Sequence, residues 1–314
     1  MYLVGIDENG FGPALGPLNV SASLFEVEKY ENDFWKKLND VFSKNKDKNK
    51  LRLTDSKELA RKEWEKIALI FYFLLFKEIP LYSSLFLKEF TLKQEFLAKN
   101  CGEEEKNMCW QPDFSFPLWE EKIFLKEIPL LGKRVKEALK RERIKVLDIK
   151  TLVCCPHNFN YLLRTYNKIE LNLYLFETLI EYYYQKCQDE IFFVCGKVGG
   201  IKYYRRYFKL LKKYDCIDFK EEDKLSQYHF KDLGRVYFIQ NGDSKYLPIS
   251  LSSIIGKYIR EIFIMRINTY FSSRIPGLPY VSGYRDKLTK EFIKKVERKL
   301  PELNISSSCF RREK

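Results

Sequence analysis

The opening stretch of the chain, residues 3–18, constrains its fold more than any other segment. An apolar run is typical of a buried strand, and it ends on two adjacent carboxylates, Asp7 and Glu8. Three glycines and two prolines follow by residue 17, and their density favours a tight turn in which the backbone approaches a ligand closely. A buried carboxylate is costly unless it is paired or binds a metal. For an isolated Asp-Glu pair, a plain surface turn would be the simpler alternative.

Length and charge set the next bounds. The chain has 314 residues, of which 45% are hydrophobic and 32% charged, so it can form one large domain or two of ordinary size. Its 56 Lys and Arg exceed its 43 Asp and Glu by 13. That excess favours a polyanionic partner such as nucleic acid, because basic side chains attract phosphates whatever the sequence. Genome composition or growth temperature also produces lysine-rich chains.

Several protein classes are not expected. A strand begins at residue 2, so we expect no secretory signal, and the longest apolar run, Ile67–Phe76, is too short to span a bilayer. The eight cysteines include no CxxC pair and no His partner at metal-ligand spacing. This predicts reduced thiols, a cytoplasmic location and no zinc. The two histidines, His157 and His229, have no neighbours that suggest a triad, so histidine-centred acid–base chemistry is not expected.

The hydrophobic pattern alternates between strands and helices. It predicts strands at 18–25, 143–153, 191–194 and 235–240, a strand-like piece at 81–87, and helices at 28–42, from about 53–59 to 76, 131–142, 161–185, 249–270 and 287–300. Asp55 or Ser56 is a suitable N-cap for the second of these helices. Strands alternating with helices after an antiparallel opening pair favour a mixed α/β fold. The long middle region argues against a regular doubly wound sheet.

Three stretches, in this order, resemble type 2 ribonucleases H, the ribonucleases HII and HIII. Gly5–Pro17 resembles the family's opening Gly-Ile-Asp-Glu-Ala-Gly-Arg-Gly-Pro-x-x-Gly-Pro signature, and Leu53–Lys57 resembles its Asp-Ser-Lys segment. Gly242–Glu261 is similar to its Gly-Asp-Ser segment and the helix that follows. Tyr284, after Gly283, stands where the family has a Gly-Tyr pair. The matches run from residue 3 to about 286 and are weakest between 77 and 185.

The resemblance implies a ribonuclease H-like mixed sheet flanked by helices, and hydrolysis of the RNA strand of RNA–DNA hybrids or of ribonucleotides in DNA. It implies a ribonuclease H-like domain at 1–270 with an insertion at 77–150, and a C-terminal helical extension at 271–314. It also implies Mg²⁺ or Mn²⁺ held by an Asp-Glu-Asp-Asp set. Carboxylate oxygens are hard ligands that suit both ions, and two such ions could activate a water and stabilise the leaving 3′ oxygen.

Matched residue by residue, Asp7 and Glu8 take the first two places of that set and Asp243 takes the fourth. The third place has no carboxylate, since Cys195 or Gly196 stands there, and a thiolate is a poor Mg²⁺ ligand. Glu261 is a candidate stand-in carboxylate, although an ordinary place on the helix surface explains it equally well.

The glycine turn also departs from the family, which has Arg or Lys where this chain has Phe11. A divergent bacterial group resembling ribonuclease HII shares this Gly-Phe/Tyr-Gly turn, the Lys-x-Gly-Gly segment at 197–200 and the Lys-Tyr-x-Arg-Glu segment at 257–261. An Asp precedes the Lys in that group, and Gly196 aligns with it.

By analogy with the family, several residues would contact the substrate. The backbone of the turn would approach the ribose, Lys57 would lie near the phosphates, and Tyr284 would pack on a sugar or base; core packing is the alternative for Tyr284. The full set is Gly10, Phe11, Gly12, Lys57, Lys197, Lys257 and Tyr284.

Two functions follow from these residues. The first is a metal-dependent endonuclease, weakened by the missing third carboxylate. The second is a catalytically inactive nucleic-acid-binding protein on the same fold, which would recognise A-form geometry through backbone and 2′-hydroxyl contacts. The missing ligand favours the second. The three retained carboxylates favour the first, because clustered carboxylates repel one another unless a cation is present.

Overall fold

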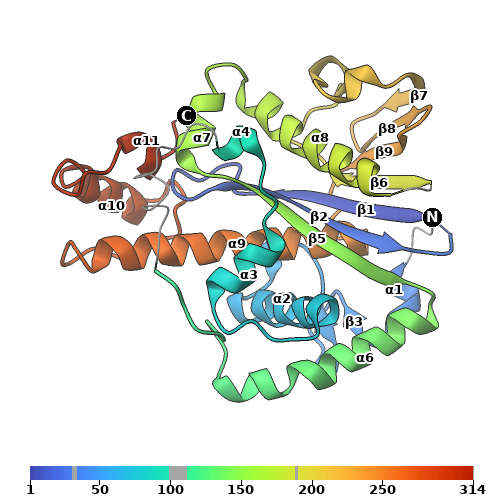
Figure 1. The fold of residues 1–314 in the computed structure, drawn as a ribbon, viewed down its shortest axis with the longest axis horizontal. Coiled ribbons are helices and arrows are strands. Elements are labelled where there is room, and N and C mark those ends of the chain that lie inside the picture. The colour runs from blue at the N-terminus through green and yellow to red at the C-terminus, as the bar shows by residue number, and fades with distance from the viewer. Residues whose placement is uncertain (30–33, 99–111, 188–189, 314) are drawn as a thin grey trace.

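The computed structural model describes residues 1–29, 34–98, 112–187 and 190–313, and a seven-stranded mixed sheet forms its centre (Figure 1). The spatial order of the strands is β5 (Lys145–Cys154), β2 (Leu18–Glu26), β1 (Tyr2–Asn9), β6 (Ile191–Gly196), β9 (Gly234–Ile239), β8 (Leu225–Phe230) and β7 (Cys216–Glu221). β1 pairs antiparallel with β2 and parallel with β6, and β6 pairs parallel with β9. The expected mixed α/β fold and its antiparallel opening pair are confirmed.

Helices cover both faces of this sheet, as Figure 1 shows. One layer contains α2 (Arg61–Phe76), α3 (Ser83–Phe90), α6 (Ile128–Arg141) and α9 (Leu247–Ser272), and the other contains α7 (Pro156–Leu162) and α8 (Lys168–Lys186). Successive side chains of a strand point to opposite faces. In β1, Leu3 therefore packs in the α9 layer, and Val4 and Ile6 pack in the α8 layer.

The shorter elements lie around these layers. They are α1 (Phe34–Lys37), β3 (Phe42–Ser43), β4 (Leu51–Arg52), η1 (Ser56–Glu58), α4 (Glu95–Ala98), η2 (Lys122–Lys126), η3 (Arg205–Tyr207), η4 (Leu211–Lys213), α10 (Lys287–Glu297) and α11 (Ser307–Phe310). α10 and α11 pack against the end of α9, where Phe271 meets the rings of Phe292 and Phe310. Ala14 and Leu15 of the glycine turn belong to the same apolar cluster. This C-terminal part is therefore joined to the turn that follows β1.

Helix α9 packs directly on the backbone of the first strands. A Cβ atom at Gly5 would lie 2.2 Å from the carbonyl carbon of Pro248, so glycine allows the helix to approach this closely. The side-chain amide of Asn9 donates to the Ser253 carbonyl at 2.9 Å. These contacts place the first turns of α9 beside the carboxyl end of β1.

Several predicted elements differ from the structure. The strand-like piece at 81–87 lies mostly in helix α3, where Phe86 and Phe90 pack against α2 and α9 rings at helical spacing. The single helix predicted at 161–185 is two helices, because Asn167 caps α8 by accepting from the backbone N–H groups of Ile169 and Glu170. Of the helix predicted at 28–42, the described part contains only α1, and residues 30–33 lie outside it.

The structure adds a hairpin that the sequence pattern did not reveal, strands β7 and β8. β7 is an edge strand in which Ile217 and Phe219 alternate with charged residues, but these apolar side chains are 55% and 43% exposed. β5, in turn, begins inside the interval 77–150 and forms the opposite edge of the sheet. The interval 77–150 therefore includes the start of an edge strand of the sheet, and its residues 99–111 lie outside the described part. The expected boundary at residue 270 falls within α9.

Two of the expectations from the sequence concern membrane-spanning helices and the state of the cysteines. None of the described helices is long and apolar enough to cross a membrane. Among the described cysteines, those at positions 155, 187, 195 and 216 are free thiols. Cys101 and Cys109 lie outside the described residues.

Candidate active site

The topology of the sheet brings three acidic residues together. β1, β6 and β9 are adjacent and parallel, so their carboxyl ends meet at one edge, the usual position of ligand sites in such sheets. Asp7 and Glu8 end β1, and Asp243 lies in the turn four residues after β9. Because neighbouring residues of a strand face opposite ways, Asp7 lies toward α9 and Glu8 toward α8.

Asp7 is held in a crowded, buried position. Burial raises the pKa of its carboxyl well above the usual range, and the negative charges of Glu8 and Asp243 raise it further. A hydrogen bond from Ser253 on α9 opposes this rise. The Ser253 hydroxyl also lies 3.1 Å from that of Ser56, which connects the acidic site to the Asp-Ser-Lys segment.

Glu8 has a similar environment on the other face of the sheet. Burial raises its pKa to about 7, Asp243 adds to the rise, and Lys57 opposes it. The side chain of Asn172, on α8, lowers the pKa of Glu8. Asn172 is fully buried, and its amide oxygen has no hydrogen-bond partner among the described residues. A buried amide oxygen without a partner therefore lies on the residue that contacts Glu8.

Asp55 also lies beside these carboxylates, although the sequence indicated only a helix-capping role for it. Its carboxylate does cap η1 by accepting from the Lys57 backbone N–H at 2.9 Å. It also interacts with Asp243, whose pKa is raised by burial and then by Asp55, while the Ser244 backbone N–H opposes the rise. No local sequence signal points to this second role, because Asp55 and Asp243 are brought together only by the docking of η1 beside α9.

Lys57 is the cation that faces all of these carboxylates. Burial lowers its pKa, but Asp55, Asp243, Asp7 and Glu8 together raise it above the ordinary value. Its ammonium lies 3.8 Å from the Asp55 carboxylate, and its side chain is 81% exposed. One exposed lysine therefore only partly balances four carboxylates.

Gly196, rather than Cys195, occupies the position beside Asp7. Cys195 packs in the α8 core, whereas Gly196 ends β6 on the same face as Asp7. A Cβ atom at Gly196 would lie 2.2 Å from Oδ1 of Asp7. The third carboxylate is therefore absent, and the Asp7 side chain occupies part of the space that it would need.

The donor chemistry of this edge fits a divalent cation. Among the residues that the structure describes, no three His, Cys, Asp or Glu side chains are grouped closely enough to hold a metal ion. The oxygen donors Asp7, Glu8 and Asp243 are nevertheless the type that Mg²⁺ and Mn²⁺ prefer. Burial raises the pKa values of all three, and the charge of Asp243 raises those of Asp7 and Glu8 further, a cost that a bound cation would reduce. The unpartnered amide oxygen of Asn172 is one more oxygen donor on a residue that contacts Glu8.

The glycine turn lies next to this edge in a conformation that requires glycine. Gly10 has a φ of +89°, and a Cβ atom there would lie 2.6 Å from the Pro17 carbonyl oxygen and 3.3 Å from Nε of Arg260. Tyr284 lies over the Arg260 guanidinium at 4.9 Å and is 42% exposed. Phe11 packs beneath the Lys168 ammonium, which lies 4.5 Å from the centre of its ring.

Glu261 and Lys257, both candidates from the sequence, form an ion-pair network instead of joining the carboxylates. Glu261 Oε1 accepts from Arg260 at 2.8 Å and from Lys257 at 3.1 Å, and Oε2 lies 3.6 Å from Arg61. Three cations therefore compensate its charge, which makes it a poor replacement for the third carboxylate. The Lys257 ammonium also lies 5.5 Å from the Tyr284 ring, next to the turn.

Lys197 is a second predicted substrate-contact residue whose head group is engaged elsewhere in the structure. Its ammonium donates to the backbone carbonyls of Glu222 and Asp223 at 2.8 and 2.5 Å, and so ties the end of β6 to the β7–β8 turn. The charged groups that affect its pKa are Asp223 and Lys202. We interpret Lys197 as a structural contact.

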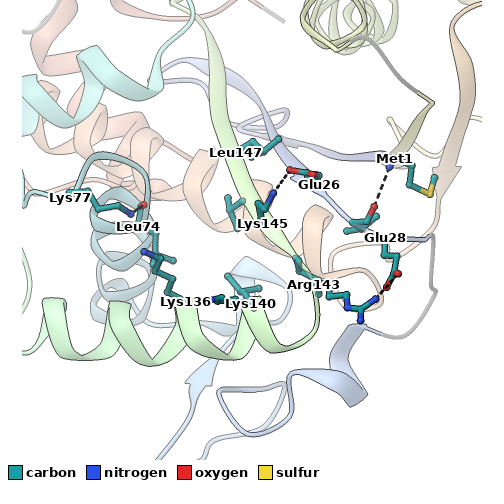
Figure 2. A pocket seen from close by; sticks show the side chains of 14 residues that line it. Met1, Glu26, Glu28, Leu74, Lys77, Lys136, Lys140, Arg143, Lys145 and Leu147 are labelled. Carbon is teal, nitrogen blue, oxygen red and sulfur yellow. Dashed lines mark hydrogen bonds and ion pairs between the residues drawn. The ribbon is translucent and has the colours of Figure 1, made fainter.

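A separate pocket of about 740 Å³ lies at the opposite end of β1, where the strand begins (Figure 2). Met1 lines it, together with basic residues of α6 and β5 such as Lys140 and Lys145. Figure 2 shows Lys145 paired with Glu26, and Arg143 with Glu28, at 3.0 and 2.7 Å. The pocket has no residue in common with the acidic edge.

No protein-family profile and no curated protein matches this sequence. Solved structures with similar folds include ribonuclease HII from Archaeoglobus fulgidus in complex with PCNA, at 18% identity and a TM-score of 0.46, covering 100% of this chain and 98% of that chain. Ribonuclease H2 from Pyrococcus horikoshii is 14% identical with a TM-score of 0.47, over 99% and 92% of the two chains. Aquifex aeolicus RNase H3 is 15% identical with a TM-score of 0.44, over 99% and 71%.

Proposed function

We propose that this protein is a metal-dependent endonuclease that hydrolyses the RNA strand of RNA–DNA hybrids or ribonucleotides within DNA. The observation that supports this most directly is the position of Asp7, Glu8 and Asp243 at the carboxyl ends of β1 and β9, on either side of β6, where the charge of Asp243 raises the pKa of both Asp7 and Glu8. Clustered carboxylates cost stability unless they bind a cation, so their presence favours a working metal site.

Asp7, Glu8 and Asp243 would hold Mg²⁺ or Mn²⁺, and the bound metal would polarise the phosphate and supply an activated water. Lys57 would contact a phosphate oxygen, because its exposed ammonium is the cation that faces all four carboxylates. The turn at Gly10 and Gly12 would admit the ribose, since a Cβ atom added at Gly12 would meet no atom within 4 Å and the backbone there is open.

The alternative is a protein that binds hybrids without cleaving them. It is favoured by one observation, the 2.2 Å between an added Cβ at Gly196 and Oδ1 of Asp7, because the side chain of Asp7 has taken space that the third carboxylate would need. In that case the basic surface and the glycine turn would still recognise the geometry of the duplex.

The two functions are separated by a cleavage assay. The purified protein is incubated with Mn²⁺ or Mg²⁺ and either a labelled RNA–DNA hybrid or DNA containing one ribonucleotide. We expect cleavage that is lost in Asp7→Asn and kept in Asp47→Asn, a matched change in an exposed loop. Hybrid binding by all three proteins in EDTA, without cleavage by any of them in either metal, would overturn the enzyme and leave the binding protein.

A further inference from the structure

The C-terminal tail reaches the glycine turn and places an arginine inside it. The backbone N–H of Arg312 donates to the Ala14 carbonyl at 2.9 Å, and its Nη2 donates to the Pro13 carbonyl at 2.5 Å. Arg311 pairs with Leu15 in an isolated bridge. The last residues of the described chain are therefore part of the same structure as the turn that follows Asp7 and Glu8.

Arg312 is a buried cation whose charge is not balanced. Its side chain is 3% exposed and lies over the Phe159 ring at 5.0 Å. Its Nε and Nη1 have no hydrogen-bond partner, and no carboxylate in the described part of the chain forms an ion pair with it. Burial and the charges of Arg260 and Arg285 lower its pKa to about 9. A buried charge without a partner is costly, so its retention needs a compensating anion.

Further cations surround the same turn. Lys168 extends from the start of α8 over Phe11, and burial, Arg312 and Arg285 lower its pKa. Arg285 is exposed, so it can reach a ligand from solvent. Arg260 is fully buried, with Nε unpaired beside Gly10. Of these four cations, Arg260 pairs with Glu261, a carboxylate that Lys257 and Arg61 also share.

We propose that Lys168, Arg285 and the buried Arg312 form a phosphate subsite around Phe11, which binds a phosphodiester group of the nucleic acid strand. The subsite rests on the proposed function and names one of its substrate contacts. Lys168 and Arg285 contact the phosphate from the surface, and Arg312 adds positive charge from below. Guanidinium groups suit this ligand, because their N–H groups match phosphate oxygens in pairs.

The position of the subsite agrees with a single bound strand. Phe11 is three residues from Glu8, so their backbones are at most about 11 Å apart. The strand whose phosphodiester lies at the carboxylates can therefore place a neighbouring phosphate at Lys168. Lys168, Arg285 and Arg312 also supply positive charge beside the turn, which the apolar side chain of Phe11 does not supply.

The test uses Lys168→Ala and Arg285→Ala, which remove partly or fully exposed groups, and Lys140→Ala, a matched control in the pocket at the other end of β1. Binding of an RNA–DNA hybrid is measured in EDTA at several salt concentrations. Each lost phosphate contact lowers the slope of log K against log salt by up to about 0.9. We expect this loss in Lys168→Ala and Arg285→Ala and no change in Lys140→Ala. Equal slopes in all three variants would overturn the subsite and leave the proposed function intact.

A second measurement covers the case in which the protein binds no hybrid. The thermal midpoint of each protein is recorded in inorganic phosphate and in chloride at equal ionic strength. We expect phosphate to raise the midpoint of the wild type and of Lys140→Ala more than that of Lys168→Ala or Arg285→Ala. Stabilisation without hybrid binding would contradict the proposed function but keep a phosphate site. Equal stabilisation of all the proteins by phosphate would overturn the subsite.

Discussion

Restoring a carboxylate at Gly196 should make the stability of the protein depend on a divalent metal. An added Cβ would lie 2.2 Å from Oδ1 and 3.3 Å from Cγ of Asp7, so the end of the Asp7 side chain must move away. An off-rotamer side chain costs about 0.5–1.5 kcal/mol, and replacing a strand glycine recovers about 0.5–1 kcal/mol. The steric part of the change is therefore small, and Gly196→Ala should alter the free energy of unfolding by at most about 1 kcal/mol.

Gly196→Asp adds a fourth carboxylate to this edge, and its cost is electrostatic. Two unit charges 4 Å apart interact with about 4 kcal/mol at an effective dielectric constant of 20. The new carboxyl can avoid that repulsion by staying protonated, which costs about 4 kcal/mol at pH 7 for an ordinary Asp. Without metal, Gly196→Asp should thus lose up to about 4 kcal/mol more than Gly196→Ala. Mn²⁺ at 100 times its Kd should restore about 2.7 kcal/mol.

Urea unfolding of both variants in EDTA and in Mn²⁺ measures these differences, and hybrid cleavage is followed in parallel. We expect Mn²⁺ to stabilise Gly196→Asp more than Gly196→Ala and to increase its rate of cleavage. If the two variants are equally stable in EDTA and respond equally to Mn²⁺, then position 196 does not face the acidic edge and the reasoning is wrong.

Three further predictions concern stability. Because burial raises the pKa of Glu8 to about 7, the native state binds more protons than the unfolded state, and the free energy of unfolding without metal should fall as the pH rises from about 4.5 to 7. Glu8→Gln should remove up to about 3 kcal/mol of this fall, measured by urea unfolding across that pH range. A pH profile that Glu8→Gln leaves unchanged would contradict the prediction. Gly10→Ala should lower the free energy of unfolding by about 2 kcal/mol because of the positive φ at that position, whereas Gly12→Ala, with open space around it, should be nearly neutral. Equal urea midpoints for the two variants would show that residue 10 is not strained. Glu65 is fully buried, and its carboxylate accepts hydrogen bonds from the three backbone N–H groups of residues 118–120. Glu65→Gln should therefore lower the free energy of unfolding by about 1–3 kcal/mol and speed hydrogen exchange at these amides. Amides at 118–120 that stay as protected in the variant as in the wild type would contradict this.

Local patterns were sufficient to predict the main elements of the sheet. Apolar alternation marked β2 and β5, an apolar run marked β6, and the alternation that follows the glycine turn predicted the antiparallel pairing of β2 with β1. The same patterns failed where tertiary context mattered more. Residues 81–87 looked like a strand because their apolar side chains are closely spaced, but packing against α2 and α9 gives them helical spacing. β7 was missed although Ile217 and Phe219 alternate with charged residues in it, and the structure leaves both exposed at the edge of the sheet.

The sequence by itself determined which residue types stand at the acidic edge, because Asp7, Glu8 and the glycine turn are contiguous and Asp243 follows its own strand. Only the tertiary structure decided how they are arranged. The pleat of β6 places Gly196, not Cys195, beside Asp7. Chain folding then brings Asp55 to Asp243 and Arg312 to Pro13. These pairs are separated by well over a hundred residues. No local propensity encodes such contacts, because they form only when separate helices and the C-terminal tail dock on the same sheet.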